Sequence, residues 1–223
     1  MSTYLREEIQ GEAATRNIEA FAEFLDLIAM ANGHELNYER LASDCQVSTS
    51  TLKNYLQILE DTLLGFKLPG FTKTKKRKAT SRSKHFLFDI GVVNCLCQRS
   101  PIRPKSELFG SAFEHFIILE IRAFLSYRRL QNFKMTYWRS TSQYEVDLIV
   151  GDQWAIEIKG THLVQDRHLK GLRALKEEGM AMSYFVVSLD NAERLTDDEI
   201  RVLPWKIFLE HLWADQLIQS RAD

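Results

Sequence analysis

Residues 145–160 read EVDLIVGDQWAIEIKG and predict two strands joined by a short turn at residues 151–153. Apolar side chains recur at every second position before and after that turn, which is typical of a β-hairpin with at least one buried face. The same alternation puts Asp147, Glu157 and Lys159 on one face of the hairpin. In the first strand the expected faces are Val146, Leu148 and Val150 on one side and Glu145, Asp147 and Ile149 on the other.

A three-residue turn sets Asp147 directly across from Glu157, and like charges in opposed positions of two strands destabilise a sheet. A carboxylate in a mostly apolar environment also costs several kcal/mol unless it is compensated. Two kinds of compensation are open. Lys159 can form a structural ion pair with the acids, or Asp147 and Glu157 can bind a divalent cation, Mg²⁺ or Mn²⁺, with waters and phosphate oxygens as further ligands.

The chain around the hairpin predicts an α/β domain. A long apolar helix is expected over residues 108–129 and a strand over 135–139, ahead of the hairpin. An amphipathic helix at 166–179, a strand at 182–189 and a closing helix from residue 205 follow it. The predicted order is therefore helix, three strands, helix, strand, helix.

The N-terminal part predicts a helical domain. Apolar residues of the stretch 18–33 fall on one helical stripe, and two further helices are expected around Tyr38–Cys45 and Ser50–Asp61 with a break between them. Ser48 or Ser50 can cap the last of these helices. Its inward side chains are expected to be Leu52, Tyr55, Leu56 and Leu59. This layout is that of a helix-turn-helix, and strands at 63–71 and 84–92 would complete a winged helix.

The charge distribution suggests DNA as a partner, although the net charge of the whole chain is only -1. Asp89 is the only acid between Thr62 and Ser100, in a segment rich in lysine and arginine. Helix-turn-helix packing also occurs in domains that touch no DNA, but a basic loop between the strands can lie along phosphates. The expected DNA contacts are Thr51, Lys53 and Asn54 on the second helix and Lys73, Lys75, Lys76, Arg77, Lys78, Arg82 and Lys84 in and beside the loop.

Composition adds broader expectations. The three cysteines form no second pair that would complete a zinc site, and no run of 18 apolar residues or signal peptide occurs. We therefore expect a soluble cytoplasmic protein without a membrane partner. Its two domains would be residues 1–100, helical with the basic wing, and residues 101–223, the α/β domain.

The spacing of Asp147, Glu157 and Lys159, on a hairpin between two helices, resembles the PD-(D/E)xK nuclease superfamily, with Val146 in place of the proline. The resemblance implies a restriction-endonuclease-like fold and a Mg²⁺-dependent DNA endonuclease, with Asp147 and Glu157 as metal ligands and Lys159 as the cation that positions water. It also implies a helix glutamate. Gly110–Glu114 matches the motif and identifies Glu114, whereas helical periodicity leaves Glu120 as a competitor. Phosphate contacts from the start of the next helix would come from Gln165, Arg167, His168 and Lys170, for most of which a solvated helix start is the simpler interpretation.

Over almost its whole length the chain also resembles the C-terminal region, a domain of unknown function, of predicted prokaryotic AAA-type ATPases. The resemblance rests on YLREEIQ at the start, the helix-turn-helix, KHFLFDIGVVNCL, LFGSAFEHFIILEI and the hairpin. No G-x-x-x-x-G-K-[ST] sequence occurs in the 223 residues, so we expect no ATP hydrolysis from this chain. The resemblance implies an AAA-type ATPase domain as a partner, or self-association. It leaves open a non-catalytic DNA-binding, regulatory or protein-interaction module.

Overall fold

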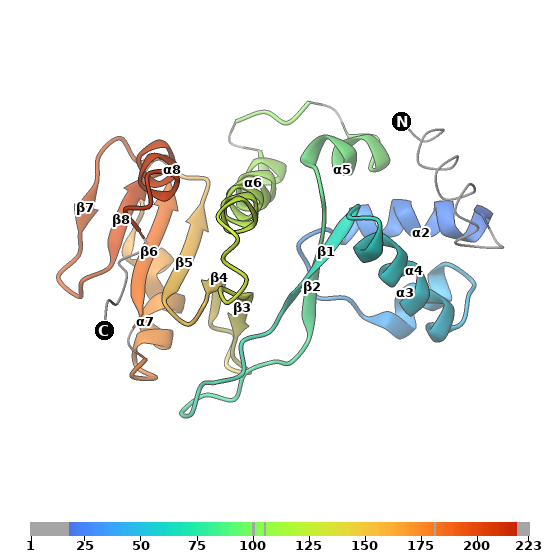
Figure 1. Cartoon of the computed structure of the whole chain (residues 1–223), viewed down its shortest axis with the longest axis horizontal. Helices are drawn as coiled ribbons and strands as arrows, with labels where there is room; N and C mark the ends of the chain where they lie inside the picture. Colours follow the sequence, from blue (N-terminus) through green and yellow to red (C-terminus); the bar gives the residue numbers. More distant parts are fainter. Residues whose placement is uncertain (1–17, 100, 105, 181, 218–223) are drawn as a thin grey trace. The chain divides into compact units, whose positions relative to one another are not determined.

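The computed structural model describes residues 18–99, 101–104, 106–180 and 182–217. The chain forms two compact units (Figure 1). Unit 1 comprises the chain up to Leu68 together with Arg82–Ile102, and unit 2 comprises Pro69–Ser81 and the chain from Arg103 onward. The stretch YLREEIQ lies outside the described residues.

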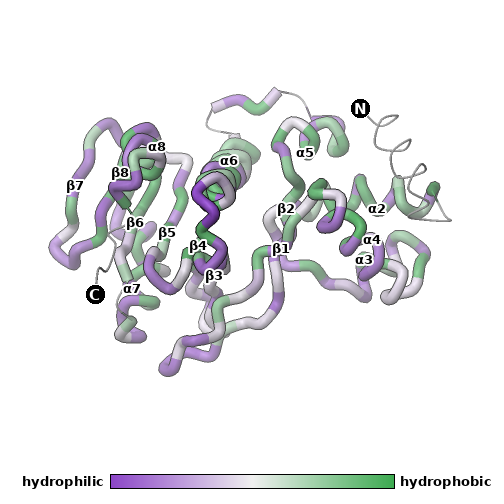
Figure 2. The backbone as a smooth tube through the Cα atoms, in the orientation of Figure 1, coloured by the Kyte–Doolittle hydropathy of each residue, from purple (hydrophilic) through white to green (hydrophobic). Residues whose placement is uncertain are grey.

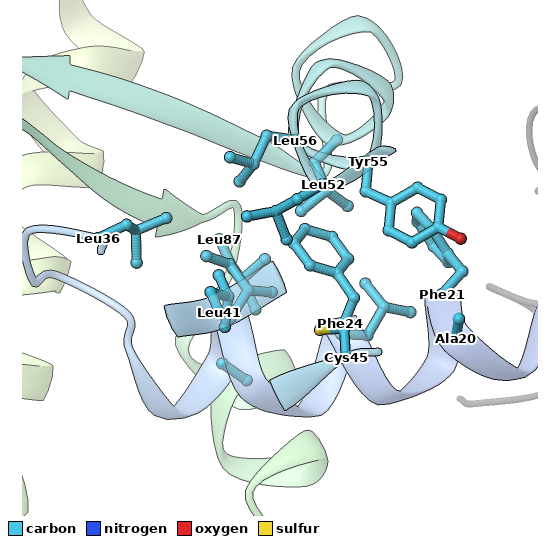
Figure 3. Close-up of a cluster of buried hydrophobic side chains, with 14 of the residues drawn as sticks. Ala20, Phe21, Phe24, Leu36, Leu41, Cys45, Leu52, Tyr55, Leu56 and Leu87 are labelled. Atoms are coloured by element: carbon cyan, nitrogen blue, oxygen red, sulfur yellow. The ribbon is translucent and has the colours of Figure 1, made fainter. Parts of the chain in front are cut away.

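Unit 1 is helical with a two-stranded sheet. Its elements are α2 (Ile18–Met30), α3 (Tyr38–Asp44), α4 (Thr49–Asp61), β1 (Gly65–Pro69), β2 (Ser83–Leu87) and α5 (Ile90–Leu96). Ser48 caps α4 by accepting the Thr51 N–H at 3.1 Å, as one of the two predicted caps. The four predicted inward residues of α4 are buried, and Figure 3 shows three of them, Leu52, Tyr55 and Leu56, grouped with Phe21 and Phe24 of α2.

One sequence prediction in unit 1 is wrong. The strand predicted over residues 84–92 ends at Leu87, because Asp89 begins a helix instead. The Asp89 side chain accepts the Val92 N–H at 2.9 Å, and the buried side chains of Val92 and Val93 join the core of unit 1. An N-cap aspartate followed by apolar residues is a helix start, which the run of apolar letters concealed.

Unit 2 is a mixed sheet with helices on both faces. Its elements are α6 (Glu107–Tyr127), β3 (Met135–Arg139), β4 (Glu145–Val150), β5 (Trp154–Lys159), the 3-10 helix η1 (Asp166–Leu169), α7 (Lys170–Lys176), β6 (Ser183–Ser188), β7 (Arg194–Leu195), β8 (Arg201–Pro204) and α8 (Trp205–Trp213). The strand order is β3-β4-β5-β6-β8-β7. Strands β3, β4 and β5 are antiparallel neighbours, and β6 runs parallel to both β5 and β8.

The two faces of the sheet follow from β6. Tyr184 and Val186 share a core cluster with Leu172 and Leu175 of α7. Phe185, between them in the strand, meets Phe208 of α8 instead. Since neighbouring strand residues point to opposite faces, α7 covers one face, and α8 covers the other together with α6, which it contacts through aromatic pairs. The predicted order of helices and strands is confirmed, while the short strands β7 and β8 were not predicted.

A β-bulge alters the predicted faces of β4. Pairing between β3 and β4 shifts between Thr136 and Trp138, so that β4 uses one more residue than β3 across this step. Val146 and Ile149, which strict alternation puts on opposite faces, consequently belong to the same core cluster. The extra residue falls at positions 147–148, where the strand carries the aspartate.

The segment 69–81 between β1 and β2 packs within unit 2, on the edge strand β3. The Phe71 N–H donates to the Tyr137 carbonyl at 2.7 Å, and the Thr80 N–H donates to the Arg139 carbonyl at 2.9 Å. The Thr141 N–H donates back to the Lys78 carbonyl at 2.9 Å. Its polar tip is visible in Figure 2. An edge strand covered in this way has fewer exposed backbone groups to pair with another chain.

No helix in the described parts of the chain is both long enough and apolar enough to cross a membrane.

Two helical glycines provide a matched test of packing. A Cβ at Gly171 in α7 would collide with the backbone carbonyl of Glu145 in β4, whereas a Cβ at Gly110 in α6 would meet nothing within 4 Å. Gly171→Ala is expected to lower the free energy of unfolding by roughly 1–3 kcal/mol through overpacking. Gly110→Ala is expected to be neutral or to raise it by up to about 1 kcal/mol. Chemical denaturation of both variants checks this, and equal effects would contradict close packing of α7 on β4.

Candidate active site on the β4–β5 hairpin

The structure brings Asp147, Glu157 and Lys159 together. The turn at 151–153 joins β4 to β5, and the two strands pair as far as Leu148 and Ile156, so that Asp147 and Glu157 are the next residues along them. Lys159 Nζ lies 2.6 Å from Glu157 Oε1 and 3.2 Å from Asp147 Oδ2. Asp147 Oδ2 also accepts the Ile158 backbone N–H at 2.7 Å, which fixes this carboxylate against β5.

The two carboxylates are buried, with side chains 8% and 9% exposed for Asp147 and Glu157, and they share one ammonium. Glu157 Oε2 is buried and has no hydrogen-bond partner among the described residues. Burial, the charge of Asp147 and that of Glu114 raise the pKa of Glu157 to about 8, against the opposing effect of Lys159. Burial alone would lower the pKa of Lys159, but both carboxylates hold it above its ordinary value, so the lysine is charged.

The structure separates the two candidate helix glutamates. Glu114 in α6 is half-buried and close enough to Glu157 to raise its pKa by charge repulsion. Glu120, six residues further along α6, accepts the indole N–H of Trp213 in α8 through Oε2 at 3.1 Å. Glu114 is thus electrostatically part of the hairpin site, whereas Glu120 ties α6 to α8.

The residues that open the next helix make mostly local contacts. His168 Nδ1 accepts the Gln165 N–H at 3.1 Å, and Arg167 Nε lies 3.2 Å from His168 Nε2. Burial and the charges of Arg167 and Lys159 lower the pKa of His168, so its imidazole is neutral at neutral pH. Lys170 is exposed at the start of α7.

The donor set at the hairpin suits a hard divalent cation in one respect. Glu157 Oε2 is a buried oxygen without a partner, beside a second carboxylate, and Mg²⁺ prefers oxygen ligands. Within the described ranges, no group of three or more His, Cys, Asp or Glu side chains is placed to hold a metal ion. Any cation here would therefore take its remaining ligands from water or from a substrate.

The predicted DNA contacts are divided between the units. In unit 1, Lys53 and Asn54 are exposed on α4, and Thr51 is half-buried in its first turn. Arg82 lies 3.8 Å from Glu35, and Lys84 is buried, 6% exposed, in β2. Because the Lys84 side chain is buried, it could contact a phosphate only if it became exposed.

The remaining predicted contacts, Lys73, Lys75, Lys76, Arg77 and Lys78, lie in the segment 69–81 of unit 2. The structure adds one residue that the sequence did not reveal. The buried carboxylate of Glu178, just after α7, accepts the backbone N–H groups of Lys75, Lys76 and Arg77 at 2.8, 2.7 and 3.1 Å. These contacts join positions about 100 residues apart, so no local pattern could indicate them.

The fold and site describe a two-unit protein whose α/β unit carries a buried Asp, a buried Glu and a half-buried Lys on a hairpin. Residues 1–103 match the family model of a domain of unknown function, DUF8612, and residues 109–208 match a second one, DUF4143.

Among curated proteins, the chain is similar to the uncharacterized protein Rv2008c of Mycobacterium tuberculosis and the uncharacterized protein Mb2031c of Mycobacterium bovis, each 29% identical over 142 residues. The similarity covers 60% of this chain and 31% of each relative, so the chain spans about a third of the length of the curated relatives it matches. No solved structure matches the chain.

The charge state of Glu157 gives a stability prediction. The pKa of Glu157 is about 8 in the fold and near the ordinary glutamate value of 4.5 when unfolded, so its contribution to stability is full below pH 4.5 and is lost as the pH rises through 8. Glu157→Gln mimics the neutral form and is expected to be more stable than wild type at pH 9, by at least about 1 kcal/mol, and nearly equal to it at pH 5. Thermal unfolding in a chelating buffer measures the difference, and a constant gap between pH 5 and pH 9 would contradict the raised pKa.

Proposed function

We propose that unit 2 is a metal-dependent phosphodiesterase of the PD-(D/E)xK type that cleaves DNA. The observation that carries the proposal is the buried, unpartnered Oε2 of Glu157, beside a second carboxylate and a lysine on neighbouring strands. When both acids are ionised, two carboxylates and one ammonium leave an excess of negative charge, and a divalent cation that replaces the Glu157 proton would relieve it.

Asp147 and Glu157 would hold Mg²⁺ or Mn²⁺, which when bound supplies an activated water and neutralises charge on a phosphodiester. In the reaction, a water oxygen would bond to phosphorus as the bond from phosphorus to the leaving sugar oxygen breaks, the water losing a proton to solvent and the sugar oxygen taking one up from solvent. Lys159, which is charged, orients the water and stabilises negative charge on the phosphoryl oxygens. Glu114 adds negative charge near Glu157, which raises the pKa of Glu157 and would also attract a bound cation.

Fold and surface support the same proposal. The order α6, three antiparallel strands, α7 and a parallel strand is the order expected for this superfamily, and the bulge at β4 falls beside Asp147. Bulges are frequent next to active sites. In unit 1, α3 and α4 form a helix-turn-helix followed by the β1–β2 pair, and the exposed Lys53 and Asn54 would face DNA as in winged-helix proteins.

A second function has its own support. Lys159 contacts both acids, and a lysine that satisfies them without a metal would make unit 2 a scaffold in a DNA-binding or regulatory module. An AAA-type ATPase domain in trans or a second copy of the chain would be its protein partner. Calorimetry with Mn²⁺ separates the two functions, since the scaffold needs no cation.

The nuclease proposal predicts cleavage of DNA in Mg²⁺ or Mn²⁺ and its loss in a chelator. Asp147→Ala and Lys159→Ala are each expected to reduce the rate at least about 100-fold, because each removes a group that stabilises transition-state charge. Rates are measured on duplex, single-stranded and branched DNA. Asp147→Asn is expected to lose Mn²⁺ binding in calorimetry.

Glu114→Gln and Glu120→Gln form a matched pair on one helix. Of the two helix glutamates, only Glu114 shifts the pKa of Glu157. Glu114→Gln is therefore expected to slow cleavage roughly 10-fold, within the range of single electrostatic contributions, while Glu120→Gln leaves the rate unchanged. Wild-type protein that leaves all three DNA forms intact with either metal overturns the nuclease and leaves the scaffold.

A further inference from the structure

Unit 2 contains a second buried glutamate, and its surroundings differ from those of the hairpin. The side chain of Glu178 has 0% exposure and accepts the backbone N–H groups of Lys75, Lys76 and Arg77 at 2.8, 2.7 and 3.1 Å. Arg77 Nη1 lies 3.4 Å from Glu178 Oε1 and donates to the Ala174 carbonyl at 2.9 Å. Three consecutive amides that converge on one carboxylate fix the backbone of the loop tip.

Other contacts hold the rest of the segment. Its two arms are bonded to β3 and the residues after it, through the Tyr137 and Arg139 carbonyls and the Thr141 N–H. The Arg77 guanidinium lies over the Tyr144 ring, 5.4 Å from the centroid, and pairs with Glu177. The segment is thereby ordered on unit 2 before it meets any ligand.

The ordered tip presents cations outward. Residues 73–78 carry five positive charges. Lys73 pairs with Asp152, Arg77 pairs with the two glutamates, and the Lys76 ammonium donates to the Glu177 carbonyl. Lys75 and Lys78 are exposed, and in the described part of the chain neither ammonium makes an ion pair. The Glu178 carboxylate, which we call the carboxylate clamp, therefore accepts hydrogen bonds from backbone amides. Two lysine side chains remain on the ordered turn without an acidic partner among the described residues.

We propose that residues 73–78 form a phosphate-backbone binding edge that belongs to unit 2, and that Glu178 is the positioning residue that preorganises it for duplex DNA. This rests on the proposed function for the identity of the ligand. In a winged helix the basic turn belongs to the helical domain. Here the proposed binding edge is fixed to the nuclease-like unit instead, so it would contact the same DNA as that unit. Preorganisation matters because a free turn of this length would have to be ordered when it binds.

The test asks whether a variant that loses a negative charge binds DNA more weakly or more tightly than wild type. Glu178→Gln removes a negative charge beside the cationic turn, so electrostatics alone would strengthen DNA binding. The amide NH₂ of glutamine would face backbone N–H donors, however, which releases the turn. We expect Glu178→Gln to bind duplex DNA about 5-fold to 10-fold more weakly than wild type, as an ordering cost of this size implies. Glu177→Gln, which removes the same charge from an exposed neighbour, is expected to bind equally or slightly more tightly.

The same titrations, with the full chain in EDTA at 50–200 mM salt, include Lys75→Gln/Lys78→Gln. Losing two phosphate contacts is expected to reduce the slope of log affinity against log salt by about 2. An unchanged slope overturns the binding edge. Glu178→Gln that binds like Glu177→Gln overturns the positioning role.

Hydrogen exchange of wild-type protein tests the clamp without any variant that could fail to fold. The amides of residues 75–77 are expected to be protected in the free protein, and exchange as fast as in an unstructured peptide overturns the proposal. None of these experiments measures DNA cleavage. A protein that binds DNA as described but never cleaves it refutes the nuclease alone, and one that cleaves while Lys75→Gln/Lys78→Gln binds normally refutes the binding edge alone.

Discussion

Two buried carboxylates share one half-buried ammonium on adjacent strands of unit 2, and this charge cluster is the constraint that the rest of the hairpin must accommodate. Lys159 reaches Glu157 at 2.6 Å and Asp147 at 3.2 Å, yet Glu157 Oε2 has no partner among the described residues. A buried acid in this state is costly, and the fold does not remove the cost by exposing it. The surrounding sheet, with helices on both faces, holds the acids where their own repulsion would separate them.

That placement depends on backbone features rather than on the acids themselves. The three-residue turn at 151–153 sets the register of the hairpin, in which Asp147 and Glu157 each come one residue beyond the last pair, with Gly151 and Asp152 both at positive φ of 57° and 58°. The β4 bulge moves Val146 into the core cluster of Ile149 and so re-aims the strand around Asp147. Backbone geometry thus concentrates charge at one end of the hairpin, and α6 adds Glu114 to it.

The sequence alone predicted the structure correctly where the periodicity of apolar residues and the local chemistry agreed. Alternation identified the hairpin, helical stripes identified α4 with its buried Leu52, and Ser48 was one of the two predicted caps. It failed where tertiary contacts decide. The bulge depends on the partner strand β3, and the segment 69–81 reads as part of a wing although its hydrogen bonds lie with β3 and Glu178. Periodicity could not choose between Glu114 and Glu120, because both lie near the apolar arc of α6. The two are distinguished by a tertiary contact, the hydrogen bond that Glu120 accepts from α8.

Glu157 and Glu178 show how partners, rather than burial, separate a candidate functional acid from a structural one. Both side chains are buried. Burial opposes ionisation of Glu178, but the amides of Lys76, Lys75 and Arg77 and the Arg77 guanidinium outweigh it and lower the pKa of that carboxyl. At Glu157, burial and the neighbouring acids outweigh one ammonium and raise the pKa to about 8. Four donors satisfy the Glu178 carboxylate, whereas Glu157 Oε2 has none among the described residues, so the partners rather than the depth of burial set the two pKa values apart.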